Sequence, residues 1–201
     1  MRVLVACEFS GVVREAFRKR GHDAWSCDLL PAEDNSAFHY QGDVKFFMPC
    51  RKWDLMIAHP PCTYLCNSGV KHLYADGKKS NGRDEGRWAK MRDAAEFFLW
   101  LHDAPIPHCI ENPIMHGYAT EIFADCGFPT KPSQIIQPWQ FGHGETKATG
   151  IWLVGLPLLY PTQIVSGRSP RVHYASPGPN RWKERSRTLQ GIADAMALQW
   201  G

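Results

Sequence analysis

The sequence has no long apolar run and no large excess of charge of one sign. It contains nothing close to the roughly 18 consecutive apolar residues that mark a membrane-spanning helix. Its N-terminal residues lack the basic flank and apolar stretch of a signal peptide. The formal net charge is only +3, which does not identify a nucleic-acid partner by itself. We therefore expect a cytoplasmic protein whose function depends on particular residues.

The seven cysteines do not form the pattern of a disulfide framework. Their number is odd, their spacing is irregular, and several lie in apolar runs, so we expect reduced thiols. A zinc site is also weakly supported. Cys62 and Cys66 form one close pair with His59 and His72 nearby, whereas structural zinc sites normally need two such pairs. We therefore expect no metal.

What the sequence does contain is an alternation of β-rich runs and amphipathic helical stretches, without internal repeats. The expected strands are residues 2–6, 23–28, 54–58, 108–111, 133–137 and 151–154, and the expected helices are 12–20, 86–101 and 188–200. Such an alternation predicts an α/β fold, with a Rossmann-like and mostly parallel sheet flanked by helices. The hydrophobic content of 44% is enough for a core in one domain spanning residues 1–201.

Polar and unusual residues fall at the carboxyl ends of the expected strands. They are Ser10-Gly11, Asp28, Pro60-Pro61-Cys62 and Glu111-Asn112-Pro113, in chain order. In an open parallel sheet, ligands bind at this edge, beside the point where the strand order reverses. The sequence therefore predicts an active site there.

Cys62 is the candidate nucleophile of this edge. Two prolines fix the backbone before it, and a thiol at a strand end is accessible and open to a lowered pKa. Glu111 directly follows a buried strand, so we expect burial to raise its pKa until it donates a proton or hydrogen bond near neutral pH. The alternatives are a packed structural cysteine and a surface or helix-capping glutamate.

Two loops are candidates for substrate contact. Residues 63–87 are rich in glycine and basic residues with little periodicity, which favours a catalytic lid that closes over substrate. Residues 160–187 interleave basic and aromatic side chains, which suits phosphate contact and base stacking. A solvated surface loop is the alternative. The candidate nucleic-acid contacts in this basic loop are Arg168, Arg171, Arg181, Trp182, Lys183, Arg185 and Arg187.

Taken in order along the chain, these elements resemble the cytosine-C5 DNA methyltransferases, in a small, phage-like form without the usual target-recognition domain. The family's nucleophile lies in a Pro-Cys element, here Pro61-Cys62, and its acid lies in a Glu-Asn element, here Glu111-Asn112. Four further segments resemble the family's cofactor-binding elements: Phe9-Ser10-Gly11, Asp28, Gly42-Asp43 and the C-terminal residues 191–200. The matching elements span most of the chain.

The resemblance implies the S-adenosylmethionine-dependent methyltransferase fold and methyl transfer to C5 of cytosine in DNA. Cys62 would add to C6 of the base, which makes C5 nucleophilic, while Glu111 stabilises the charge at N3. The target base would be flipped out or already unpaired. S-adenosyl-L-methionine is the implied cofactor. Asn112 is the residue of the Glu-Asn element that would contact the substrate. The implied cofactor-binding residues are Phe9, Ser10, Gly11, Asp28, Asp43 and Pro60.

The sequence departs from the family at two places. Lys147 lies where the family has an arginine-rich element, and we expect it to assist catalysis in its place, although a lysine cannot form a bidentate fork. The basic loop is the only candidate substitute for a recognition domain. Three alternatives therefore stay open: modification of a free pyrimidine nucleotide, transfer of a different one-carbon group, and a catalytically silent nucleic-acid-binding module of the same fold.

Overall fold

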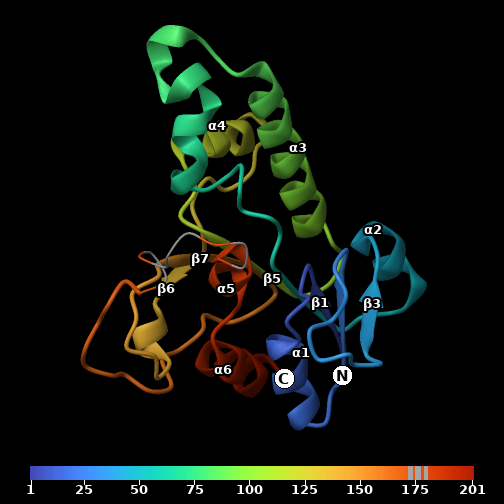
Figure 1. The fold of residues 1–201 in the computed structure, drawn as a ribbon. Helices are drawn as coiled ribbons and strands as arrows, with labels where there is room; N and C mark the ends of the chain where they lie inside the picture. The colour runs from blue at the N-terminus through green and yellow to red at the C-terminus, as the bar shows by residue number, and fades with distance from the viewer. Residues whose placement is uncertain (172–173, 175–177, 179–180) are drawn as a thin grey trace.

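In the computed structural model, which describes residues 1–171, 174, 178 and 181–201, the described chain is organised around one seven-stranded sheet (Figure 1). The strands are β1 (Arg2–Ala6), β2 (Asp23–Asp28), β3 (His39–Gln41), β4 (Leu55–Ala58), β5 (His108–Pro113), β6 (Gln134–Ile136) and β7 (Thr149–Val154). Their order is β3-β2-β1-β4-β5-β7-β6. The first five strands of this order are parallel, and β7 runs antiparallel to both β5 and β6.

The central strands β1 and β4 are apolar along their length because both of their faces are covered. Residues 3–6 of β1 and 55–58 of β4 are almost completely buried, which is the pattern of strands inside a parallel sheet. Alternate side chains point to opposite faces. Leu4 therefore packs into one core together with Met56, while Val3 packs into the other core with Leu55.

Helices cover the two faces of the sheet. One core lies under α2 (Val44–Phe47), α3 (Glu85–His102) and α4 (Gly117–Asp125), and the other lies under α1 (Val12–Lys19) and α6 (Gln190–Trp200). The short helix α5 (Arg181–Ser186) precedes α6 (Figure 1). No helix in the described ranges combines the length and the apolar character needed to cross a membrane.

The fold class expected from the sequence is confirmed: the sheet is Rossmann-like and mostly parallel, and helices flank it on both faces. The chain passes from β1 to β2 and β3 on one side, then returns to place β4 on the other side of β1. The order reverses between β1 and β4, which is where this class of sheet binds its ligands.

Two sequence expectations are wrong. Residues 67–81 are not a structureless loop but form the 3-10 helices η2 (Asn67–Leu73), η3 (Ala75–Gly77) and η4 (Lys79–Asn81). The segment is fixed to α3 because Leu73 is buried and its carbonyl accepts a hydrogen bond of 2.8 Å from Trp88 Nε1. In addition, β5 extends two residues beyond its expected end at Glu111, since β7 pairs with β5 as far as Pro113.

Candidate active site

The carboxyl ends of β1, β4 and β5 bring three ionisable side chains to one point of the sheet edge. Ala6, Ala58 and Ile110 are neighbours in the strand registers. The His59 backbone N–H donates to the Ala6 carbonyl at 2.9 Å, which carries the ladder one residue beyond β4. Glu8, His59 and Glu111 therefore come together although about fifty residues separate each from the next.

His59 and Glu111 form a nearly buried pair. His59 Nδ1 lies 3.2 Å from Glu111 Oε2, and the two side chains are 12% and 11% exposed. Thr188 Oγ1 donates to the same carboxylate oxygen at 3.4 Å. His59 Nε2 is buried and has no hydrogen-bond partner among the described residues. The sequence located Glu111 but considered His59 only as a zinc ligand.

The two members of this pair shift each other's pKa. Burial lowers the pKa of His59, but the hydrogen bond and charge of Glu111, together with the charge of Glu8, raise it more. Burial raises the pKa of Glu111, yet His59, Lys147 and Thr188 bring it below its usual value. The raised pKa expected for Glu111 is therefore wrong, because a cation from the neighbouring strand outweighs desolvation. The arrangement favours an imidazolium beside a carboxylate.

Glu8 is a buried acid that sequence reasoning missed. Its oxygens accept hydrogen bonds from the backbone N–H groups of Val13 at 2.6 Å and Arg14 at 3.2 Å. It thus binds the exposed donors at the N-terminus of α1, where a negative charge is favourable. Burial still raises its pKa above the usual value, against the charge of His59 and these hydrogen bonds. The sequence signal that could have identified Glu8 is its position shortly before the start of a helix.

The loop between β1 and α1, which includes Phe9-Ser10-Gly11, requires glycine at its last position. Gly11 has φ 74°, and a Cβ there would collide with the guanidinium of Arg14. That guanidinium is fully buried and contacts Asp34 and the Ser26 hydroxyl. The loop therefore holds its shape at the point where the sequence predicts a cofactor.

A small cavity lies directly at this loop. Its volume is about 40 Å³, and its lining residues are Cys7, Glu8, Phe9, Ser10 and His59 from the sheet edge and Ser186, Arg187 and Thr188 from the chain after α5. Cofactor-sized ligands occupy about 300–1,000 Å³. The acidic and hydroxyl groups of this cavity suit a nucleoside with a charged tail. The cavity is too small for such a ligand while residues 186–188 stay in place.

Residues 181–188, which we call the cover segment, close the cavity from outside. The ring of Trp182 lies 5.9 Å from that of Phe9, and Arg187 forms an ion pair of 2.6 Å with Glu33. Lys147 Nζ donates to the Arg185 carbonyl at 3.0 Å. The segment therefore contacts the predicted cofactor loop and the Glu111 pair through several independent interactions.

The structure distributes the predicted nucleic-acid contacts over more than one place. Arg168 stacks over Trp139 at 3.8 Å, and Arg171 pairs with Glu145 at 3.1 Å. Arg181, Trp182, Lys183 and Arg185 lie in α5, and Arg187 follows it within the cover segment. Residues 172–173, 175–177 and 179–180 of the basic loop lie outside the described residues. Nucleic-acid contact by this loop stays a prediction.

Cys62 and Cys66 form a thiol pair in the turn after β4. The Cys62 carbonyl accepts hydrogen bonds from the N–H groups of Leu65 and Cys66, both at 3.0 Å. The following residues are fixed to the chain after β5, since His116 N–H donates to the Leu65 carbonyl at 3.0 Å. The Cys62 and Cys66 side chains are hydrogen-bonded to each other within this turn.

The two thiols have opposite pKa shifts. The hydrogen bond with Cys66, followed by burial, raises the pKa of Cys62, while the charge of Lys147 opposes this. The hydrogen bonds from Cys62 and Ser68 lower the pKa of Cys66 to about 5, although burial acts in the other direction. The expected lowering of the Cys62 pKa is therefore wrong in this arrangement, because the hydrogen bond with Cys66 and burial both favour its protonated form.

The remaining predicted residues lie around the same edge. Asp28 is half-buried at the end of β2, accepts a hydrogen bond from Leu30 N–H at 2.9 Å, and has a pKa raised by burial. Asp43 caps α2 by accepting from Lys45 N–H at 2.9 Å. Pro60 is buried. Asn112 is fully buried, and its amide has no hydrogen-bond partner within the described residues.

All seven cysteines carry free thiols. In the described part of the chain, no three His, Cys, Asp or Glu side chains lie close enough together to hold a metal ion. His143 and Glu145 have other partners: His143 Nε2 accepts from Gly191 N–H at 2.9 Å, and Glu145 pairs with Arg171.

Comparison with known proteins finds similarity to solved structures but none to protein families or curated sequences. No protein-family model and no curated protein sequence matches the chain. Among solved structures, the chain is similar to a triple mutant of DNMT2 from Spodoptera frugiperda, with a TM-score of 0.41 and 11% sequence identity. The alignment covers 82% of this chain and 54% of that chain, so this chain spans about half the length of that protein. The fold class therefore rests on the strand order and registers described above.

Proposed function

We propose that this chain transfers a methyl group from S-adenosylmethionine to C5 of cytosine in DNA, with Cys62 as the nucleophile. The observation that carries the proposal is that two residues follow or end neighbouring strands at one edge of the sheet. The Pro-Pro-Cys62 turn follows β4, and the buried Glu111 lies on the adjacent strand β5. A nucleophile and an acid at the carboxyl edge of a parallel sheet suit covalent catalysis on a ring.

The thiol pair supports the first chemical step. The proton shared by the two sulfurs must lie on Cys66 before the Cys62 sulfur can attack. Cys62 then forms a bond to C6 of the cytosine, and the electron pair of the C5–C6 bond becomes available at C5. The charge of Lys147 favours the Cys62 thiolate, since it lowers the pKa of that thiol. In this role Lys147 contributes only its positive charge, so the bidentate hydrogen bonds of an arginine are not needed.

Glu111 and His59 support the proton transfer that accompanies this attack. As negative charge builds on the ring, N3 takes a proton from Glu111, and His59 supplies a proton to Glu111 through the 3.2 Å contact. After methylation, a solvent water takes the C5 proton, the ring double bond is restored, and the Cys62 thiolate leaves. N3 returns its proton to Glu111, which passes it back to His59. A hydrogen-bonded donor of this kind stabilises charge that develops only in the transition state.

The cofactor would supply an electrophilic methyl group. Phe9, Ser10, Gly11 and Pro60 would shape its site, while Asp28 and Asp43 would accept hydrogen bonds from its ribose and adenine. The half-buried carboxylate of Asp28 at the end of β2 suits ribose hydroxyls. Because the cavity measures about 40 Å³, the cover segment has to move before the cofactor enters.

We further propose that residues 1–201 act as one methyltransferase domain and that DNA is the partner. Asn112 would face the substrate. Residues 63–87 would close over the substrate, and the basic side chains between 160 and 187 would replace a separate recognition domain. An unpaired or flipped base is required because the edge of a stacked base does not reach a nucleophile in a protein cleft.

A mechanism-based trap tests the reaction. An oligonucleotide that contains 5-fluorocytosine cannot lose a proton from C5, so it should form a denaturation-resistant adduct with the protein when S-adenosylmethionine is present. Cys62→Ser should abolish the adduct, whereas Cys66→Ser should still form one. An adduct that survives Cys62→Ser would remove the assignment of the nucleophile. Trapping by the free 5-fluorodeoxycytidine monophosphate at an equal rate would instead identify a nucleotide substrate.

A further inference from the structure

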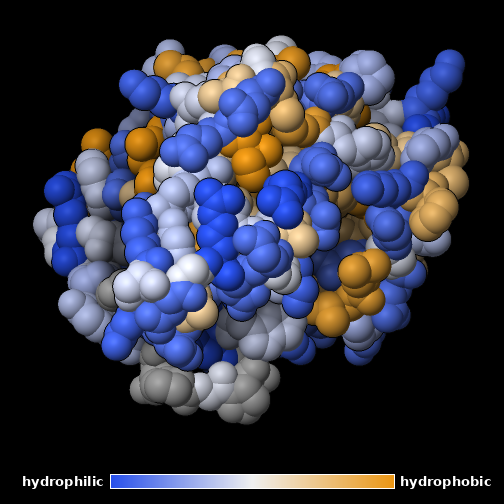
Figure 2. All heavy atoms as spheres, turned by 90° about the horizontal axis from the view of Figure 1, so that it is seen from above, coloured by the Kyte–Doolittle hydropathy of each residue, from blue (hydrophilic) through white to orange (hydrophobic). Residues whose placement is uncertain are grey.

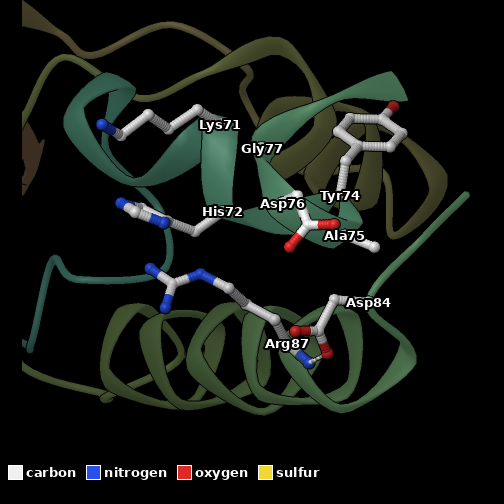
Figure 3. Close-up of a pocket in the computed structure, with 8 residues that line it drawn as sticks. All are labelled: Lys71, His72, Tyr74, Ala75, Asp76, Gly77, Asp84 and Arg87. Atoms are coloured by element: carbon white, nitrogen blue, oxygen red, sulfur yellow. Dashed lines mark hydrogen bonds between the residues drawn. The ribbon is translucent and has the colours of Figure 1, made fainter. Parts of the chain in front are cut away.

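The segment that follows the candidate nucleophile contains a second cavity, with a volume of about 380 Å³ (Figure 3). One wall is formed by residues 71, 72 and 74–77, and the other is formed by Asp84 and Arg87 at the start of α3. The volume falls within the range of about 300–1,000 Å³ that small-ligand sites occupy. The cavity lies away from the cofactor loop, and the chemistry proposed above does not use it.

The polar groups of this cavity are sorted by charge. Figure 3 shows the side-chain nitrogens of Lys71, His72 and Arg87 gathered at one end, whereas the carboxylates of Asp76 and Asp84 lie toward the other. Asp84 is occupied as the cap of α3, since it accepts a hydrogen bond of 3.0 Å from Arg87 N–H. A ligand with an anionic group at one end and hydrogen-bond donors at the other would match this arrangement.

The cations at the basic end are not neutralised by the protein. Within the part of the chain that the structure describes, neither Lys71 nor Arg87 forms an ion pair. Arg87 Nε is buried without a hydrogen-bond partner among those residues. A buried guanidinium donor without an acceptor costs free energy, and an incoming phosphate would satisfy it with charge-assisted hydrogen bonds.

Arg87 is held against the chain that leaves Cys62. Its guanidinium lies 5.0 Å from the centre of the Tyr64 ring. A Cβ on Gly69 would lie 3.4 Å from Arg87 Nη2 and would collide with the Thr63 carbonyl. The basic end of the cavity therefore borders residues 63 and 64, directly after the nucleophile.

The surface around the cavity carries further basic side chains, which lie next to aromatic rings. Lys79 Nζ lies 5.7 Å from the Tyr74 ring and 5.4 Å from the Tyr118 ring, and the Arg83 guanidinium lies 4.1 Å from the Trp88 ring. Figure 2 looks onto this end of the molecule and shows a mostly hydrophilic face with a few apolar patches. Basic groups beside aromatic rings suit a single strand of nucleic acid.

We propose that this cavity binds one nucleotide unit of the target strand, next to the base presented to Cys62. Lys71, His72 and Arg87 hold its phosphate, and Asp76 accepts from the donors of its sugar or base. The inference rests on the proposed function only in naming the strand that Cys62 attacks. It assigns the substrate contact to residues 71–87, in addition to the basic residues between 160 and 187.

Binding measured without chemistry tests the site. In a Cys62→Ser background, which forms no adduct, the affinity for a fluorescent single-stranded oligodeoxynucleotide is followed by anisotropy as salt rises. Lys71→Ala and Arg87→Gln should each lower the slope of log affinity against log salt by about 0.7. Lys131→Ala and Arg92→Gln, which change exposed cations elsewhere, should leave it unchanged. Slopes identical to those of these controls would overturn the proposal.

Two further arms locate the phosphate and its source. One neutral methylphosphonate placed beside the target cytosine should weaken binding to the Cys62→Ser protein but not to the same protein carrying Arg87→Gln. An equal loss of affinity in both proteins would overturn the contact between Arg87 and the phosphate. The proposal would also be overturned if deoxycytidine monophosphate bound as tightly as the whole strand and displaced it completely. Since Lys71 is exposed, Lys71→Ala reports on the site even where Arg87→Gln disturbs folding. A failed 5-fluorocytosine trap with a normal salt effect would count against the reaction alone.

Discussion

At the sheet edge, charged neighbours outweigh burial in setting the pKa values of His59 and Glu111, whereas burial outweighs them for Glu8 and Asp28. Glu8, Glu111, Lys147 and Asp28 are the ionisable groups that act on His59 or are acted on by it. Two anions close to the imidazole keep it charged at pH values where an isolated buried histidine would be neutral. The His59 imidazole therefore keeps a proton above the ordinary pKa of histidine, next to the proposed substrate.

The raised pKa of His59 should be visible in the free protein. An NMR titration of the His59 imidazole should give a pKa above 6.5, and Glu111→Gln should bring it below 6.5, because burial remains while the counter-charge is lost. Glu96→Gln, an exposed change on α3, should have no effect. A value at or below 6.5 in the unaltered protein would contradict the pairing.

The same shifts set a pH window for stability. The contribution of His59 is fully present below pH 6.5 and is lost as the pH rises through its raised folded pKa. The contribution of Glu111 is present above pH 4.5 and is lost as the pH falls through its lowered folded pKa. The pair therefore stabilises the fold most between these two values.

The positions of Cys62 and Glu111 could be predicted from the sequence because both lie beside recognisable strand ends. Their pKa shifts could not. The partner of Glu111 comes from β4, and the partner of Cys62 comes from a turn at Cys66. Both depend on strand register and turn geometry, which no local pattern encodes.

Among the elements, the cover segment lines the outer side of the small cavity at the loop between β1 and α1. Its ion pair between Arg187 and Glu33 is partly exposed, with side chains 45% and 27% accessible. Such a pair contributes about 0–1 kcal/mol, after screening by solvent. The segment is therefore held by several weak contacts, which suits a part that must open.

Breaking this ion pair should speed cofactor entry. Arg187→Gln and Glu33→Gln should each raise the association rate of S-adenosylhomocysteine, followed by stopped-flow tryptophan fluorescence, by about two- to fivefold. The double variant should gain no more than either single one, since both remove the same contact. Rates equal to that of the unaltered protein in all three would mean that the segment does not limit entry.

The longer elements were predicted to within one or two residues at most ends. The strand β1 is a short apolar run, the buried residues of α3 recur at helical spacing, and β1, β2 and α3 all have clear end signals. The elements β3, α2, α4 and α5 were not predicted. The first two have only three and four residues, too few for a period to emerge, and much of α5 is exposed. Residues 67–81 were missed because 3-10 turns leave little apolar periodicity.

For the whole molecule, cofactor binding should appear as added stability. S-adenosylmethionine at about 100 times its Kd should add about 2.7 kcal/mol to the free energy of unfolding. For a chain of this size, that raises Tm by about 5–11 °C. Asp28→Asn should reduce the shift because it weakens an acceptor for ribose hydroxyls, whereas Asp93→Asn on the exposed side of α3 should not. Stabilisation by a nicotinamide or nucleoside triphosphate, with none from S-adenosylmethionine, would contradict the proposed class.

The strand order also determines when the site can exist during synthesis. Glu8, His59 and Glu111 meet only after β4 and β5 have been added beside β1. The helix α6, which packs against α1, is built from residues 190–200. A nascent chain on the ribosome therefore carries Cys62, the proposed nucleophile, long before Glu111 and the cover segment are in place. During that interval the thiol at position 62 lacks both its acid and its cover.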